Sequence, residues 1–331
     1  MQSQNWFHNK TVVVTGAAGF IGSHLCETLL HNEARVIGVD NFITGSRQNL
    51  SGFETHEHFT FLEADVSGPA EKYLADMEQL DAVLHFASPA SPPLYQAEPV
   101  ATYLANSIGT HHLLSFLKEH HPQARFLFAS TSEVYGDPQQ HPQAETYWGN
   151  VNPNGERSCY DESKRLGETI CGVFARDLGI DARVVRIFNT YGPRIDLDDG
   201  RIIPSFIKQA LAEKPFTIYG DGSQTRSYCY VDDLVHGILL FLAKEDLAGE
   251  TINLGNPDEH TVLETAQIMH AVATGRETSL EDLPLLHQTL PSDDPTRRQP
   301  DIIKARQLLG WEPTISFEEG LGRTLKYYQS R

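Results

Sequence analysis

The sequence predicts an α/β fold, in which a doubly wound parallel sheet is followed by a smaller C-terminal domain. Apolar and β-branched runs without alternation recur over residues 1–190, which is typical of strands buried on both faces of a parallel sheet. Longer helical stretches separate several of these runs, as they do in βαβ units. The chain has 331 residues, which is close to the length of two average domains.

The strands of the predicted sheet lie in the first part of the chain. Residues 10–15 form a β-branched run that ends abruptly at a glycine, and a helical stretch follows through Leu30. Further strands are predicted at residues 35–40, 59–63, 82–86, 125–130 and 182–188. The two longest predicted helices cover residues 99–120 and 160–178. Each of these helices connects two predicted strands, so the strands can pair in parallel.

The pattern changes after Tyr191, where glycine and proline interrupt shorter elements. We predict a strand at residues 216–219, a loop over 284–300 and a late helix at 302–309. The expected division is therefore a first domain over residues 1–190, to which residues 228–256 return, and a second domain that is mainly residues 191–331.

Composition excludes several classes of partner. The chain has 26 Lys and Arg against 44 Asp and Glu, a net charge of -18 that repels nucleic acid and anionic membranes. Apolar runs stay well short of the ~18 residues of a membrane span, and the first residues lack the apolar centre of a signal peptide. The four cysteines are scattered without a CxxC pair, so we expect reduced thiols in a cytoplasmic protein. The 15 histidines lack ligand spacing, and no metal is expected.

A glycine-rich turn joins the first predicted strand to the first helix. Gly16, Gly19 and Gly22 permit a tight turn and let a diphosphate approach the backbone, where the helix N-terminus offers N–H donors. Asp40 ends the second strand, and a carboxylate there accepts hydrogen bonds from both hydroxyls of an adenosine ribose. It also repels a 2′-phosphate. The pattern therefore favours NAD, although Arg47 leaves an opening for NADP.

Tyr160 and Lys164 stand one turn apart at the start of a predicted helix, so their side chains share a face. A cationic amine beside a phenol favours the phenolate, so we expect Lys164 to lower the pKa of Tyr160 toward the range of a general base. Thr131 follows the fifth strand, at the edge where an open α/β sheet binds its ligands. Together these residues predict hydride transfer, in which Tyr160 removes a hydroxyl proton while NAD accepts hydride from that carbon.

These motifs, with Asn106, resemble those of the extended short-chain dehydrogenase/reductases that act on nucleotide sugars. A narrower resemblance to the UDP-glucuronate decarboxylases, also called UDP-xylose synthases, covers nearly the whole chain. It rests on longer matching stretches at residues 39–45, 85–93, 130–138, 159–162, 186–190 and 253–257.

The resemblance implies a Rossmann fold with NAD bound to the first domain and the nucleotide sugar mainly to the second. It implies NAD-dependent conversion of UDP-glucuronate to UDP-xylose, through oxidation at C4, loss of CO2 from the 4-keto acid and re-reduction at C4. It also implies a homodimer, in which the predicted helices at 99–120 and 160–178 pack against their copies.

Related reactions remain as alternatives: a UDP-sugar 4-epimerase, a 4,6-dehydratase, or a decarboxylase that releases the 4-keto pentose. The 4,6-dehydratases place an aspartic acid between the positions of Thr131 and Glu133, where this chain has Ser132, a poor general acid. An epimerase has no evident use for Glu133. Ser132 and Glu133 therefore favour decarboxylation. A non-catalytic NAD-binding protein of this fold is a further alternative, but the tyrosine, lysine and threonine are all present.

The resemblance also implies a set of site residues. The expected catalytic residues are Thr131, Ser132, Glu133, Tyr160, Lys164 and Arg298. The expected cofactor contacts are Tyr160 and Lys164 with Gly16, Gly19, Phe20, Ile21, Asp40, Asn41, Thr44, Asp65, Val66, Ala87, Ser88 and Asn106. An anionic nucleotide sugar needs local cations in this acidic chain, which favours arginines. The expected substrate contacts are Asn189, Arg194, Arg201, Tyr219, Arg226 and Arg298.

Overall fold

The computed structural model describes residues 6–289 and 297–331, and its centre is a seven-stranded sheet. The strand order is β11-β6-β5-β4-β1-β2-β3, and every pair of neighbours is parallel. The strands are β1 (Thr11–Thr15), β2 (Arg35–Asp40), β3 (Phe59–Glu63), β4 (Ala82–His85), β5 (Arg125–Thr131), β6 (Ala182–Ile187) and β11 (Thr251–Leu254). The predicted doubly wound parallel sheet is confirmed.

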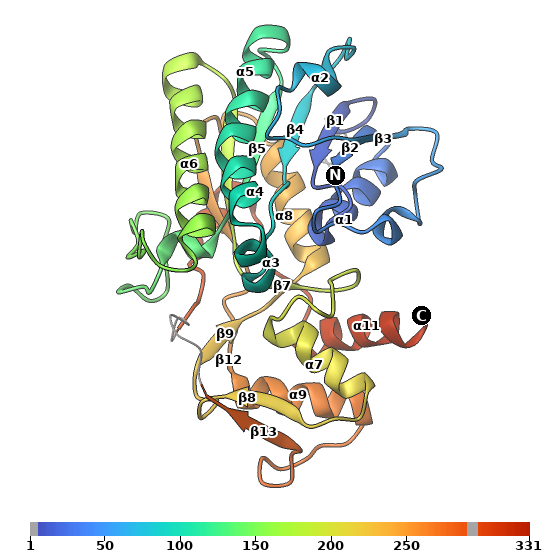
Figure 1. Ribbon diagram of the computed structural model, residues 1–331, viewed down its shortest axis with the longest axis vertical. Coiled ribbons are helices and arrows are strands. Elements are labelled where there is room, and N and C mark those ends of the chain that lie inside the picture. The colour runs from blue at the N-terminus through green and yellow to red at the C-terminus, as the bar shows by residue number, and fades with distance from the viewer. Residues whose placement is uncertain (1–5, 290–296) are drawn as a thin grey trace.

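Helices cover both faces of this sheet (Figure 1). Val12 and Val14 of β1 pack into one core with α1 (Phe20–His31) and α8 (Val231–Ala243). Val13 packs into the other core, which contains residues of α5 (Thr110–His120) and α6 (Ser158–Leu178). Successive side chains of the strand thus enter opposite hydrophobic cores, which explains why the strand sequences do not alternate with polar residues.

The remaining elements are short or belong mainly to the second part of the chain. Near the sheet lie η2 (Arg47–Leu50), α2 (Glu71–Leu74), α3 (Pro92–Ala97), α4 (Pro99–Leu104), the π-helical turn η3 (Ala105–Gly109) and η4 (Ser132–Tyr135). Later elements are β7 (Thr190–Tyr191), α7 (Ile202–Leu211), β8 (Phe216–Tyr219), β9 (Thr225–Ser227), β10 (Cys229–Tyr230), β12 (Glu259–Thr261), α9 (Val262–Thr274), β13 (Leu285–Gln288), α10 (Ile303–Leu309) and α11 (Phe317–Gln329).

Most predicted elements are confirmed with boundaries that differ by one or two residues, and two predictions need correction. The predicted helix at 99–120 is interrupted by the π-helical turn η3, which carries Asn106. The predicted loop at 284–300 is wrong at its start, because Leu285–Gln288 form strand β13, which pairs in parallel with β8. A segment of four residues flanked by prolines is too short to show a recognisable hydrophobic period. This strand therefore depends on its pairing with β8. Residues 290–296 of that loop lie outside the described residues.

The C-terminal elements α7, α9, α11, β8, β9, β12 and β13 gather beside one end of the sheet, in the lower half of Figure 1. By contrast, α8 packs against α1, and β11 extends the sheet next to β6. On this arrangement we propose the same division of domains as above, with residues 228–256 returning to the first. Among the described residues, no helix is long and apolar enough to cross a membrane.

The contact between α6 and the sheet depends on a glycine. A Cβ at Gly167 would lie 2.3 Å from Cζ of Phe128 and 2.9 Å from the carbonyl oxygen of Asn106. Replacing Gly167 by alanine should therefore push α6 from the sheet and destabilise the protein by about 1–3 kcal/mol. Thermal or denaturant unfolding measures this loss.

The matched control lies in the same helix. A Cβ at Gly172 would meet nothing within 4 Å, so Gly172→Ala should stabilise the helix by about 1 kcal/mol. Equal effects of the two substitutions would contradict the close approach at Gly167.

Candidate active site

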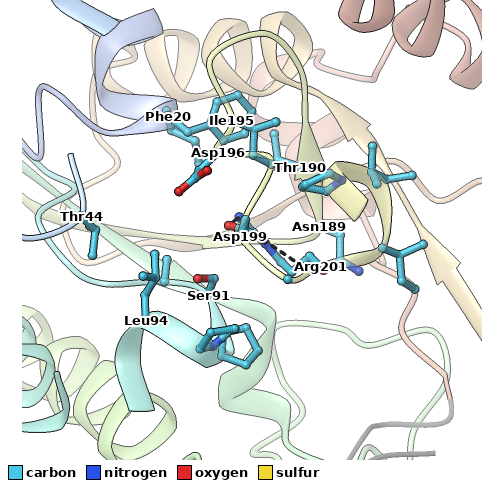
Figure 2. Close-up of a pocket in the computed structure, with 18 of the residues that line it drawn as sticks. Phe20, Thr44, Ser91, Leu94, Asn189, Thr190, Ile195, Asp196, Asp199 and Arg201 are labelled. Atoms are coloured by element: carbon cyan, nitrogen blue, oxygen red, sulfur yellow. Dashed lines mark hydrogen bonds and ion pairs between the residues drawn. The ribbon is translucent and has the colours of Figure 1, made fainter. Parts of the chain in front are cut away.

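Two adjoining cavities open at the carboxyl ends of the sheet strands. The larger has a volume of about 1030 Å³ and the smaller about 60 Å³, and both are lined by Gly16, Gly19, Thr44 and Ser88. Figure 2 shows residues of the larger cavity wall, with Thr44 on the opposite side from Asn189 and Arg201. This is the edge at which open α/β sheets bind their ligands.

The turn between β1 and α1 has no room for side chains. Gly16 has a φ of +72°, and a Cβ there would lie 2.7 Å from the carbonyl carbon of Phe86. A Cβ at Gly22 would lie 1.9 Å from the carbonyl oxygen of Gly16. The turn therefore brings bare backbone and the N-terminus of α1 to the walls of the cavities, which suits a diphosphate.

Asp40 ends β2 and lies at the smaller cavity. One carboxylate oxygen accepts a hydrogen bond from the Ala18 amide at 2.9 Å and the other accepts one from the Phe42 amide at 2.8 Å. Burial raises the pKa of Asp40, and these backbone amides offset part of the rise. Arg47 is engaged elsewhere, in an ion pair of 2.6 Å with Glu63. Backbone amides thus orient the carboxylate, and the nearby Arg47 is paired with Glu63.

All but one of the expected cofactor contacts line a cavity. Phe20 and Ile21 lie at the larger one. The smaller one is lined by Asp40, Asn41, Thr44, Asp65, Val66, Ala87 and Ser88. Asn106 lines neither; its amide nitrogen donates to the hydroxyls of Ser88 at 3.0 Å and Ser163 at 3.1 Å. Asn106 therefore holds the cavity-lining Ser88 in place through a hydrogen bond without lining the cavity itself.

Tyr160 and Lys164 both face the larger cavity from the first turns of α6. Burial raises the pKa of Tyr160 well above its ordinary value, and a hydrogen bond with Thr131 partly opposes this. Burial also lowers the pKa of Lys164 to about 7. The Lys164 Nζ donates to the carbonyl oxygen of Ala129 at 2.6 Å and lies 5.7 Å from the centre of the Tyr160 ring.

The expectation that Lys164 lowers the pKa of Tyr160 is therefore wrong for this structure. Residue spacing indicates that the two side chains share a face, but desolvation penalises the charged form of each and is the largest influence on both pKa values. Burial therefore favours the neutral phenol of Tyr160 and the neutral amine of Lys164.

Glu133 lies between two arginines. One carboxylate oxygen pairs with Arg298 and the other with Arg157. Arg298 also donates to the Ser132 hydroxyl at 3.2 Å and to the carbonyl oxygen of Gly136 at 3.0 Å. Burial, the largest influence on Glu133, raises its pKa, but the two guanidinium charges outweigh it and hold the pKa below the ordinary value. Glu133 is therefore a carboxylate at neutral pH.

The segment that carries Arg298 is held by the chain that follows Glu133. The Gln143 amide donates to the carbonyl oxygen of Gln299 at 2.9 Å, and its side-chain oxygen accepts from the Gln299 amide at 3.0 Å. The Asp301 amide donates to the carbonyl oxygen of Gln143 at 2.9 Å. Because these bonds fix residues 299–301, they also fix the direction from which Arg298 reaches Glu133.

The six expected substrate contacts all line the larger cavity. Arg201 pairs with Asp199 at 2.7 Å, and Arg194 pairs with Glu27 of α1. Arg226 is buried and donates to the carbonyl oxygen of Thr225 at 2.8 Å. With Arg298, these residues gather guanidinium groups at the cavity of a chain whose net charge is -18, and three of them pair with acidic side chains of the chain. This arrangement suits an anionic nucleotide sugar.

Sequence reasoning missed three residues of this wall, namely Arg157, Ser91 and Tyr95. Arg157 stands shortly before Tyr160, so a cation near the catalytic helix was a usable signal. Ser91 lies within the matching stretch at residues 85–93, although no role was assigned to it, and Tyr95 carried no such signal because its burial at the cavity depends on the fold.

One group in the described parts of the chain has the composition of a metal site. The ligand atoms of Glu71, Glu119 and His120 lie within 4.8 Å of one another, and all three residues are exposed. They line neither cavity. Residue spacing did not reveal this group because Glu71 comes from a different element.

Comparisons with known proteins agree with the fold and the cavities. Residues 12–255 match the NAD dependent epimerase/dehydratase family. The chain belongs to this family. It is 46% identical over 319 residues to UDP-glucuronic acid decarboxylase 1 of Danio rerio, covering 96% of this chain and 72% of that protein. It is 47% identical over 314 residues to UDP-glucuronic acid decarboxylase 6 of Arabidopsis thaliana, covering 95% and 87%.

Solved structures of the same fold include enzymes with different products. A UDP-glucuronic acid 4-epimerase from Bacillus cereus, in complex with UDP-glucuronic acid and NAD, has a TM-score of 0.85 and 31% identity, covering 97% of this chain and 99% of that one. A dTDP-glucose 4,6-dehydratase from Streptomyces venezuelae with bound NAD has a TM-score of 0.85 and 29% identity, covering 97% of each chain.

The position of Asp40 leads to a prediction about cofactor choice. Asp40→Asn should weaken NAD binding by roughly tenfold, because it removes a charged acceptor for the ribose hydroxyls, and should narrow the preference over NADP. Titration of each cofactor by fluorescence measures both effects. Arg47→Ala is the control and should leave the preference unchanged. A large change in the preference for NAD over NADP in Arg47→Ala would contradict the assignment of that preference to Asp40.

Proposed function

We propose that the chain catalyses the NAD-dependent decarboxylation of UDP-glucuronate to UDP-xylose. The observation that carries this proposal is the arrangement of Glu133, Arg298 and Ser132 beside Tyr160. Glu133 is held as a carboxylate, and the residue next to it is a serine rather than an acid. The relatives named as UDP-glucuronic acid decarboxylases cover nearly the whole chain and support the same assignment.

The cavities fit NAD. The bare turn at Gly16 and the N-terminus of α1 would hold its diphosphate, and Asp40 would hold the adenosine ribose in the smaller cavity. When bound, NAD supplies the redox chemistry at C4 of the sugar, accepting two electrons and one hydrogen and returning them at the end of the cycle.

Tyr160 is the base of the first step. Its side chain is hydrogen-bonded with Thr131, and once deprotonated to the phenolate it takes the proton of the C4 hydroxyl as that carbon is oxidised. Because the free phenol has a raised pKa, the step needs a nearby positive charge, and Lys164 is close enough to supply it when protonated. Tyr160 returns the proton to the C4 oxygen when the ketone is reduced.

Loss of CO2 follows from the chemistry of the oxidised sugar. The C6 carboxylate is β to the C4 ketone, so the electrons of the C5–C6 bond pass into an enolate as CO2 leaves. Net proton uptake at C5 then completes the pentose. Glu133 remains ionised and is placed to accept hydrogen bonds from the sugar or a water, while the two arginines offset the negative charges that meet there.

The decisive experiment is incubation with UDP-glucuronate and catalytic NAD, followed by mass spectrometry and proton NMR of the nucleotide sugar. We expect loss of CO2, a xylose spin system and no net NADH. Accumulated NADH with a 4-keto pentose would show that the cycle is incomplete. An unchanged mass with an altered sugar would make the chain an epimerase, like the Bacillus cereus structure of similar fold.

Tyr160→Phe tests the assigned base. It should lower turnover by roughly 10²–10⁴-fold, since the general base is removed, while NAD binding stays close to that of the parent protein. Initial rates of product formation and a cofactor titration measure the two quantities. Retained turnover would contradict the mechanism.

We further propose a homodimer formed by the helices on one face of the sheet. The supporting observation is a set of exposed apolar side chains on α4, η3 and α6. These three elements pack against one another within the chain. The members of the set are Val100, Tyr103, Ile108, Leu166, Val173 and Leu178. Such gathered exposure is typical of an interface. We also propose a cytoplasmic location, supported by four free cysteines.

A charge placed in this face should separate the protomers. Leu166→Glu should shift the molar mass in solution from dimer to monomer, because it buries a carboxylate in an apolar contact. Light scattering coupled to gel filtration measures the mass. Leu286→Glu, at a residue on β13 that is 52% exposed, is the matched control and should leave the mass unchanged. A parent protein that is already monomeric would overturn the proposal.

A further inference from the structure

A buried asparagine on β11, the edge strand of the sheet, has no role in the mechanism above. Asn253 pairs with Arg186 of the neighbouring strand β6, and its side chain is fully buried. It lines neither cavity. Because a buried amide has lost its hydrogen bonds with water, its partners within the protein show which parts of the chain it holds together.

Both polar atoms of the Asn253 side chain are hydrogen-bonded. Its Nδ2 donates to the carbonyl oxygens of Gln143 and Asp301, at 3.0 Å each. Its Oδ1 accepts a hydrogen bond from the Tyr135 hydroxyl at 2.8 Å. Since a carbonyl oxygen can only accept, the NH2 group of the amide must face Gln143 and Asp301. The amide therefore has one fixed orientation.

These partners lie close in the sequence to both members of the ion pair between Glu133 and Arg298. Tyr135 stands two residues after Glu133 in η4, and Asp301 stands three residues after Arg298. Gln143 is itself hydrogen-bonded to the segment that carries Arg298. One side of the amide thus holds the turn with Glu133, and the other side holds the segment with Arg298.

The segment with Arg298 has a second attachment outside the sheet. The Ser227 hydroxyl on β9 donates to the carbonyl oxygen of Arg298 at 3.2 Å. Glu133, by contrast, belongs to η4, which directly follows strand β5 of the sheet. A link between this segment and the sheet therefore sets where the Arg298 guanidinium lies relative to the Glu133 carboxylate, and Asn253 provides such a link.

We propose that Asn253 is a positioning residue that orients the Arg298 guanidinium toward Glu133. The amide acts through the segments that it holds, because it lines neither cavity itself. This inference rests on the proposed function, in which Glu133 and its arginines act on the oxidised sugar. The first step, oxidation at C4, depends on Tyr160 instead. Loss of the amide should therefore slow the loss of CO2 and leave the first step unaffected.

The first experiment is a single turnover of UDP-glucuronate on the NAD-loaded protein, in which the absorbance of NADH is followed after rapid mixing. Asn253→Ala removes the amide, and Asn253→Asp retains its size but replaces the NH2 group by an oxygen. In both variants NADH should form at the parent rate. Its decay should slow by roughly tenfold, because C4 is re-reduced only after CO2 has left and a displaced catalytic group slows that loss.

The second experiment measures the attachment of the segment without using activity. Hydrogen exchange of residues 297–303 is followed by mass spectrometry. The Asp301 amide donates to the carbonyl oxygen of Gln143, the same group that Asn253 holds, so it should exchange about tenfold faster in both variants.

Asp233→Ala is the matched control. The Asp233 carboxylate is buried and accepts hydrogen bonds from the Thr314 hydroxyl and the Ile315 amide, at 2.9 Å each, so it also holds a C-terminal segment. It lines neither cavity. This variant should alter neither the formation nor the decay of NADH, and should leave exchange at residues 297–303 unchanged.

Three results would overturn the inference. Equal slowing of NADH formation and decay would indicate a general disturbance of the cavity. Unchanged decay would show that Asn253 does not act through Arg298, and unchanged exchange would show that it does not hold the segment. Failure of the proposed function is recognised separately, because the parent protein would then release no CO2, whereas the exchange rates would still report on the attachment.

Discussion

The ionised carboxylate of Glu133 joins three parts of the chain that are far apart in the sequence. Glu133 follows β5, Arg157 directly precedes the helix that carries Tyr160, and Arg298 comes from the C-terminal part. A buried carboxylate is unfavourable unless its charge is balanced, and removing one member of such a cluster leaves the others uncompensated. The position of the catalytic helix relative to the substrate cavity therefore depends on this cluster.

Burial has the largest influence on the ionisation of the other two proposed catalytic groups. Tyr160 is a neutral phenol because its phenolate would be poorly solvated, and Lys164 has a pKa of about 7 for the same reason. Glu133 differs because two guanidinium groups contact it directly. One cavity thus holds a tyrosine and a lysine whose charged forms burial disfavours, beside a carboxylate that two guanidinium groups keep ionised. That combination suits a reaction in which one proton is shuttled at C4 while the departing carboxylate stays ionised.

Much of this arrangement could be predicted from the sequence, and the rest depends on the fold. The run at β1 and the spacing of the glycines after it are local signals, although the space at Gly16 is limited by Phe86, which is distant in the sequence. Strand β13 was missed because its four residues are stabilised by pairing with β8. The pKa of Tyr160 was expected in the wrong direction, because residue spacing indicates proximity to Lys164 but not the extent of desolvation. Tyr95 escaped notice for a similar reason, because its burial at the cavity depends on the fold.

In the proposed mechanism, the serine at position 132 bears on which reaction follows the oxidation at C4. Its hydroxyl accepts a hydrogen bond from the same Arg298 nitrogen that pairs with Glu133. A carboxylic acid at position 132 would place a second titratable carboxyl beside Glu133, and the two would compete for the Arg298 guanidinium. The pKa of one of the two carboxyls would then be raised. That carboxyl would be an acid able to protonate a leaving hydroxyl. With serine at position 132, Arg298 pairs with the carboxylate of Glu133 without competition from position 132. Position 132 then offers no acid that could protonate a leaving hydroxyl. In the proposed reaction, the ketone at C4 then accepts the electrons of the C5–C6 bond as CO2 leaves from the β-carboxylate.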